Sequence, residues 1–146
     1  MDYSRNATYY RTALLLGLVQ GEEVHRWGER VVERDPEPPQ AILEILSTSP
    51  RDLSELRHAL WPLSLEPEPV AVVRAMFALL QADLESGKRG MADTVTVLRQ
   101  MRSMLRLPSA LYQELNSELV KQATDSTVIQ HWLRGFANEH RNFLAF

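Results

Sequence analysis

The sequence contains no cysteine among its 146 residues. Disulfide bonds, thiolate catalysis and zinc sites built from cysteine are therefore excluded. Small secreted domains commonly depend on disulfides, so a chain without cysteine is expected to fold in a reducing compartment. This composition favours the cytoplasm.

The sequence also lacks a long hydrophobic run. The longest useful one, Ala13–Val19, has seven residues, whereas a helix that crosses a bilayer needs about 20. No basic start and no small-residue cleavage site frame this run, so it does not resemble a signal peptide. We expect a cytoplasmic protein without a membrane partner.

Motifs for phosphate binding and nucleophilic catalysis are missing as well. The stretch SGKRG at residues 86–90 places a lysine after a glycine, but it lacks the Walker spacing and follows a predicted helix instead of a strand. No Ser-His-Asp order can be read from the chain. These absences argue against an enzyme, and no cofactor is expected.

The sequence does contain helical periodicity along most of its length, without a convincing alternating strand. Its length suits a single helical domain, residues 1–146, and 45% hydrophobic residues suffice for a core. The expected helices cover about residues 7–20, 22–34, 38–47, 50–61, 69–85, 91–106, 109–123 and 127–144, with Gly21 as the stop of the first and Ser49 as the cap of the fourth. This pattern predicts an all-α protein, an irregular bundle of seven or eight helices built from antiparallel helical hairpins. A short helical-repeat solenoid is the alternative.

Two similar proline clusters occur, DPEPPQAILE at residues 35–44 and EPEPVAVVRA at residues 66–75. Their offset of 31 residues is about one helical hairpin, which is also the range of helical repeats. Proline fits the first turn of a helix, where no backbone donor is needed, and the neighbouring acids suit the positive end of the helix dipole. The clusters therefore predict two helix starts, with Pro38 and Pro69 in the first turn.

The stretch from Tyr10 to Leu60, YRTALLLGLVQGEEVHRWGERVVERDPEPPQAILEILSTSPRDLSELRHAL, resembles short helical bacterial proteins that carry no assigned activity. The resemblance covers about a third of the chain and implies neither a reaction nor a ligand. Fourteen of the 16 basic residues are arginine, which is typical of a GC-rich genome. Both features indicate a bacterial source.

Two Glu-x-x-His motifs, Glu22 to His25 and Glu55 to His58, are candidate metal ligands. Ferritin-like bundles combine two such motifs with two further glutamates in a di-iron site. On a helical wheel, however, His58 lies nearly opposite the core face, and Glu22 lies outside the apolar stripe. Solvent-facing side chains at helical spacing are therefore the favoured interpretation, and no metal is expected. A metal-binding bundle or an enzyme built on these two pairs is the alternative.

The last expected helix carries a histidine and an apolar end. His140 falls on its apolar face, where a histidine is a base or a pH switch in some proteins but is more often a core residue. Phe143, Leu144 and Phe146 are not expected to remain in water. We expect this tail to dock on its own core, and a homodimer contact is the alternative.

Charge is distributed unevenly along the chain. Residues 22–85 carry 13 acidic and six basic side chains, whereas residues 86–106 carry one acidic and five basic ones. Arg99, Arg102 and Arg106 are spaced to stack along one side of the expected helix. Such a row can hold an acidic partner, although a solvated face is the simpler interpretation. Nucleic acid is disfavoured, because the patch is small and has no aromatic stacking platform.

The leading hypothesis from these patterns is a non-enzymatic bacterial adaptor or regulatory domain. It would bind another protein with an acidic surface through Arg99, Arg102 and Arg106. The alternative is an enzyme or metal-binding bundle that uses His140 or the two Glu-x-x-His pairs.

Overall fold

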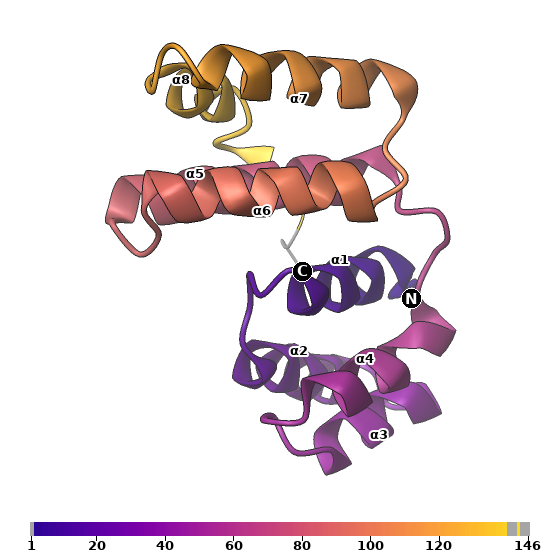
Figure 1. Ribbon diagram of the computed structural model, residues 1–146. Helices are drawn as coiled ribbons and strands as arrows, with labels where there is room; N and C mark the ends of the chain where they lie inside the picture. The colour runs from indigo at the N-terminus through magenta and orange to yellow at the C-terminus, as the bar shows by residue number, and fades with distance from the viewer. Residues whose placement is uncertain (1, 140–142, 144–146) are drawn as a thin grey trace. The chain divides into compact units, whose positions relative to one another are not determined.

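The computed structural model describes residues 2–139 and 143. These residues form eight α-helices and one short 3-10 turn, and they contain no strand, which confirms the predicted all-α class (Figure 1). Within the same residues, no helix combines the length and the apolar character that crossing a membrane requires. The chain divides into two compact units, Met1–Glu66 and Pro67–Phe146, which are described separately. The assignment of one domain to the whole chain stays a prediction.

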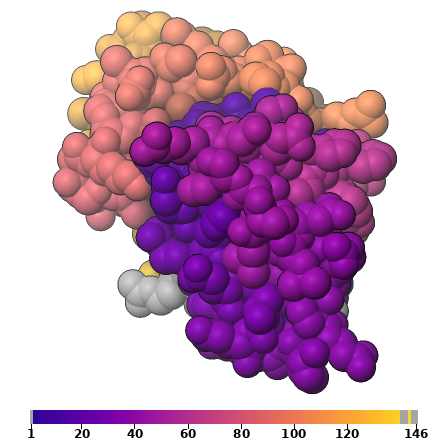
Figure 2. Space-filling view, turned by 90° about the horizontal axis from the view of Figure 1, so that it is seen from below, coloured from indigo at the N-terminus to yellow at the C-terminus, as the bar shows by residue number. Residues whose placement is uncertain are grey.

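The first unit contains four α-helices and the 3-10 turn. They are α1 (Ser4–Leu15), α2 (Gly21–Arg34), α3 (Gln40–Ser47), α4 (Leu53–Leu60) and η1 (Trp61–Leu63). Helix α1 packs against α4, while α3 contacts both α2 and α4. The fully buried Trp27 joins α2 to the α1 region, because its ring packs against Tyr3 and Tyr10. The side formed by α3 and α4 faces the viewer in Figure 2.

The second unit repeats this order of neighbours, with longer first and third helices. They are α5 (Val70–Ser86), α6 (Met91–Met104), α7 (Ser109–Gln122) and α8 (Val128–Arg134). Helix α5 packs against α8, while α7 contacts both α6 and α8. Phe77 of α5 lies with its ring centroid 5.0 Å from that of Trp132 and 5.1 Å from that of Phe136. This aromatic cluster fastens α5 to the α8 region.

Both proline clusters lie directly before helices, as predicted. Pro39 precedes α3, and its carbonyl accepts the first backbone hydrogen bond, from Ile42 at 3.0 Å. Pro69 precedes α5 and accepts in the same way from Val72 at 2.9 Å. Pro69 therefore lies one position before the first turn of α5 and Pro38 two positions before that of α3, so the prediction that both lie in the first turn is wrong. Because α3 and α5 hold different places in their units, the offset between the clusters is not a structural repeat.

The predicted end of the first helix is wrong. Helix α1 ends at Leu15, and Gly17 follows in the left-handed region at φ 71°. Glycine enters this region without the steric cost that other residues incur, so it reverses the chain here. Gly21, expected as the stop, instead begins α2. A Cβ at Gly21 would lie 1.8 Å from the carbonyl oxygen of Pro50, so the lack of a side chain is what permits this contact.

Two other helix boundaries differ from the sequence expectation. Asp52, and not Ser49, caps α4, because its carboxylate accepts a hydrogen bond from the Glu55 amide at 3.2 Å. Asp52 thereby satisfies one of the amide donors that a helix start leaves open. Helix α8 ends at Arg134, and the described residues that follow it form mainly turns. The predicted continuation of this helix to residue 144 is therefore wrong over residues 135–138, and residues 140–142 and 144 lie outside the described part of the chain.

Polar contacts hold the ends of segments in each unit. In the first unit the Tyr3 hydroxyl donates to the Asp35 carboxylate at 2.7 Å. Burial, together with this contact, raises the pKa of Tyr3 to about 12. The same hydrogen bond lowers the pKa of Asp35. The pair therefore connects the start of α1 to the end of α2.

In the second unit, ion pairs hold the ends of segments together. Arg74 of α5 makes three hydrogen bonds to the Glu139 carboxylate, at 2.5 to 3.0 Å, and lies over the Phe136 ring. The Glu139 carboxylate raises the pKa of Arg74. Asp83 is buried near the end of α5 and pairs with Arg89 across the turn that leads to α6, with 3.6 Å between the nearest atoms.

Candidate functional site

The basic row on α6 is only partly formed as the sequence predicts. Arg99 is exposed, but Arg102 is half-buried and donates to the Asn116 side-chain carbonyl of α7 at 2.9 Å. Arg106 is also exposed, but it lies beyond the end of α6, after the extended Leu105. The prediction that the three arginines stack along one helix is therefore wrong for Arg106, because the extended backbone ends the helical spacing.

The acidic residues of the neighbouring α7 already have partners. Glu114 accepts a hydrogen bond from the Trp132 indole at 2.8 Å, and Glu118 lies 3.6 Å from Lys121. Arg99 and Arg106 make no ion pair with any residue that the structure describes. Both guanidinium groups thus remain available to a partner.

Three large apolar side chains are exposed on the same helical hairpin, and two of them lie near the link between its helices. Met104 ends α6 with 50% of its surface exposed, and Tyr112 lies in the first turn of α7 with 43% exposed. The link of residues 105–108 is only four residues long, so both lie at one end of the α6–α7 hairpin (Figure 1). We refer to Arg99, Met104, Arg106 and Tyr112 as the basic hairpin surface.

The histidines of the two Glu-x-x-His motifs lie beside a backbone carbonyl and beside arginines. His25 donates from Nε2 to the Thr48 carbonyl at 2.7 Å, which holds α2 to the end of α3. His58 lies on α4 beside two arginines. Among the described residues, no three or more histidine, aspartate or glutamate side chains form a group that could hold a metal ion.

The C-terminal candidates fall largely outside the described residues. His140, Leu144 and Phe146 belong to the part of the chain that is not described. Phe143 is described, and it is buried within the single chain. This burial fits the expectation that the tail docks on its own chain, whereas self-association through Phe143, Leu144 and Phe146 stays a prediction.

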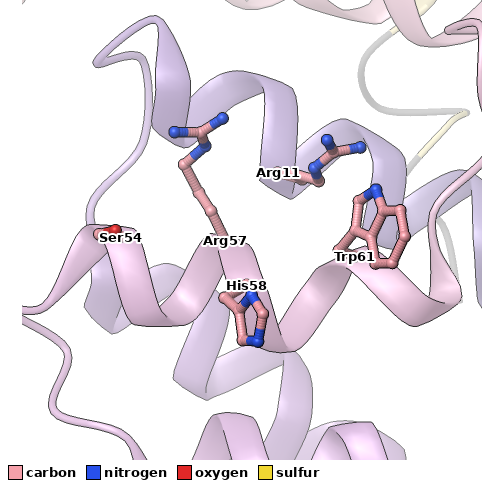
Figure 3. A pocket seen from close by; sticks show the side chains of 5 residues that line it. All are labelled: Arg11, Ser54, Arg57, His58 and Trp61. Atoms are coloured by element: carbon pink, nitrogen blue, oxygen red, sulfur yellow. The ribbon is translucent and has the colours of Figure 1, made fainter.

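A pocket of about 240 Å³ in the first unit was not identified from the sequence. It is open to solvent, and its lining comes from α1, α4 and η1: Arg11, Ser54, Arg57, His58 and Trp61 (Figure 3). Figure 3 shows the Arg57 side chain extending from α4, while Arg11 approaches from α1 beside the Trp61 indole. We call these five residues the arginine pocket.

The arginine pocket is strongly basic and incompletely satisfied. Arg11 lies 3.0 Å from the Glu66 carboxylate, whose side chain is 62% exposed. The Nε atom of Arg57 is buried and has no hydrogen-bond partner in the described part of the chain. A buried donor without an acceptor is uncommon in folded proteins, so this atom marks a place where a ligand oxygen would be stabilised.

Sequence reasoning missed the arginine pocket for an identifiable reason. The four lining residues from Ser54 to Trp61 follow the spacing i, i+3, i+4, i+7, which places them on one face of α4 and its extension. This spacing was readable, but His58 was considered as a metal ligand or a solvent-facing side chain and not as part of a pocket. Arg11 lies 46 positions from Arg57, and only the packing of α1 on α4 brings the two together.

No protein-family model, no curated protein and no solved structure matches this chain. Function is therefore argued from the basic hairpin surface and the arginine pocket.

Proposed function

We propose that this protein is a non-enzymatic binding module that recognises an acidic segment of another protein through the basic hairpin surface. The observation that carries the proposal is the pair of exposed arginines, Arg99 and Arg106, which lack an ion pair within the described residues. A bacterial, cytoplasmic adaptor or regulatory role is part of the same proposal.

The composition of the surface favours a protein partner. Arginine, tyrosine and methionine are enriched in protein interfaces, and the basic hairpin surface carries all three within one hairpin. Met104 and Tyr112 supply apolar contact area, while Arg99 and Arg106 select negative charge. A partner segment that combines acidic residues with one or two apolar anchors fits this arrangement.

Site-specific photocrosslinking in the native cell tests the proposal. A benzophenone amino acid at the exposed Gln100 of α6 should trap a protein, and the trapped segment should be acidic. The same probe at the exposed Glu44 of α3 is the matched control and should not trap that protein. The proposal fails if both positions yield the same products, or if the probe at Gln100 traps nucleic acid instead.

A charge-reversal variant shows whether the trapped partner depends on the arginines. The double variant Arg99→Glu/Arg106→Glu leaves Arg102 and its hydrogen bond to Asn116 intact, so the hairpin should stay folded. Crosslinking from Gln100 should fall at least about tenfold, because repulsion replaces attraction at two positions. Unchanged crosslinking by a folded variant would contradict a role for these arginines.

A further inference from the structure

We infer that the arginine pocket of the first unit is a binding site for a phosphomonoester, one whose phosphate lies between Arg11 and Arg57. This site is separate from the basic hairpin surface in its residues and in its ligand.

The donors of the pocket match a phosphate. Arg11 and Arg57 line the same pocket from two helices, and guanidinium groups present paired donors that suit phosphate oxygens. The Arg57 Nε is buried and has no acceptor among the described residues, so it would gain one when the guanidinium turns toward a bound phosphate. Ser54 and His58, which also line the pocket, add two exposed side chains that can donate hydrogen bonds.

Glu66 acts as an internal competitor at this site. Its carboxylate lies 3.0 Å from the Arg11 guanidinium, yet its side chain is 62% exposed, so the pair is well solvated. Solvated surface pairs are weak, and a phosphate that also contacts Arg57 would displace the carboxylate. The ion pair thus holds Arg11 in place without closing the pocket.

The size of the pocket and its tryptophan limit the ligand. A volume of about 240 Å³ is smaller than the roughly 300–1,000 Å³ of sites for drug-sized molecules, so a phosphate with one small substituent fits. Trp61 lines the pocket with 57% of its surface exposed. Its indole offers a face for a planar ring, so an aromatic phosphomonoester should bind better than inorganic phosphate.

NMR titration of the full chain with inorganic phosphate and with phenyl phosphate tests the inference. Both should shift the Arg57 Nε–H signal in a saturable way, and phenyl phosphate should also shift the Trp61 indole signal. Phenyl phosphate should bind about fivefold more tightly than phosphate, and Trp61→Ala should abolish that difference. A phosphotyrosine pentapeptide that binds more tightly still would identify a phosphorylated protein as the source; equal binding would identify a small metabolite.

Substitutions in the pocket have expected directions of effect. Arg57→Gln should weaken phenyl phosphate binding at least about tenfold. Arg57→Lys keeps the charge but loses the Nε donor, so its affinity should lie between those of the wild type and Arg57→Gln. Glu66→Gln should strengthen binding about two- to fivefold, since the competing carboxylate is removed. Arg51→Gln changes an exposed arginine outside this pocket and should have no effect.

Two outcomes would overturn the inference. One is the absence of saturable binding of phenyl phosphate by the folded wild-type protein. The other is an equal loss of binding in Arg57→Gln and Arg51→Gln, because that result would show general attraction to positive charge in place of a built site. Signal dispersion in the NMR spectrum of each variant confirms that it is folded.

Discussion

The two units share an order of helix neighbours but use it differently. The first unit carries 11 acidic and seven basic residues, whereas the second carries eight acidic and nine basic ones. Two corresponding helices differ in length: α1 and α3 have 12 and eight residues, whereas α5 and α7 have 17 and 14. The acidic unit gathers two arginines in a pocket, and the basic unit displays two on an exposed hairpin. We propose that the same arrangement of helices supports two kinds of anion recognition.

The largest expected difference between the units concerns the glycines that precede or begin their second helices. Gly21→Ala should lower the free energy of unfolding by at least about 3 kcal/mol, because the new Cβ would collide with the Pro50 backbone. Gly90→Ala, at the start of α6, should cost at most about 1 kcal/mol, because no atom lies within 4 Å of its added Cβ. Chemical denaturation of both variants measures this difference, and equal losses would show that the contact with Pro50 is not restrictive.

A smaller effect is expected from the buried ion pair of the second unit. Asp83→Ala should destabilise the protein by about 2 kcal/mol, because it leaves the charge of the largely buried Arg89 without a partner. Thermal unfolding measures the loss. The double variant Asp83→Ala/Arg89→Ala should be more stable than Asp83→Ala alone. A loss in the double variant equal to the sum of the two single losses would mean that the pair is not coupled.

The more exposed ion pairs should contribute less to stability, and the pair of Glu139 should contribute more than that of Glu66. Glu139→Ala should cost about 1 kcal/mol, because its carboxylate makes three hydrogen bonds to Arg74. Glu66→Ala should cost about 0.3 kcal/mol, because it makes a single ion pair, with Arg11, among the described residues and its side chain is 62% exposed. Denaturant midpoints of both variants test this order. A greater loss of stability in Glu66→Ala than in Glu139→Ala would contradict it.

One expected effect appears only at high pH and belongs to the first unit. The pKa of Tyr3 is raised to about 12 in the folded protein, so the unfolded chain loses this proton first as the pH rises above 10. The stabilising contribution is therefore complete below pH 10 and is lost progressively between pH 10 and 12. Unfolding curves across this range should fall less steeply for Tyr3→Phe than for the wild type. Identical slopes would show that the Tyr3 proton is not linked to folding.

Much of the fold was predictable because local chemistry determines it. Helical periodicity indicated the helices, and the proline clusters marked the starts of α3 and α5 within one or two residues. Boundaries that depend on tertiary contacts were missed. Gly21 was interpreted as a stop because glycine is common at helix ends, whereas its real constraint comes from Pro50, 29 residues away.

The candidate sites were less predictable, since they depend on packing between helices. Arg99, Arg102 and Arg106 were identified by spacing, but the hydrogen bond from Arg102 to Asn116 and the extended residue before Arg106 divide the set. The arginine pocket required the contact between α1 and α4, which no local pattern reports.

The central claim is that the exposed arginines of the second unit, and not the pocket arginines of the first, bind the protein partner. The most direct measurement is calorimetric titration of the crosslinked partner, once identified, into Arg99→Glu/Arg106→Glu and into Arg57→Gln. We expect the double variant to bind at least about tenfold more weakly than the wild type, and Arg57→Gln to bind like the wild type. The claim would be contradicted if the double variant bound the partner as tightly as the wild type while Arg57→Gln bound it more weakly.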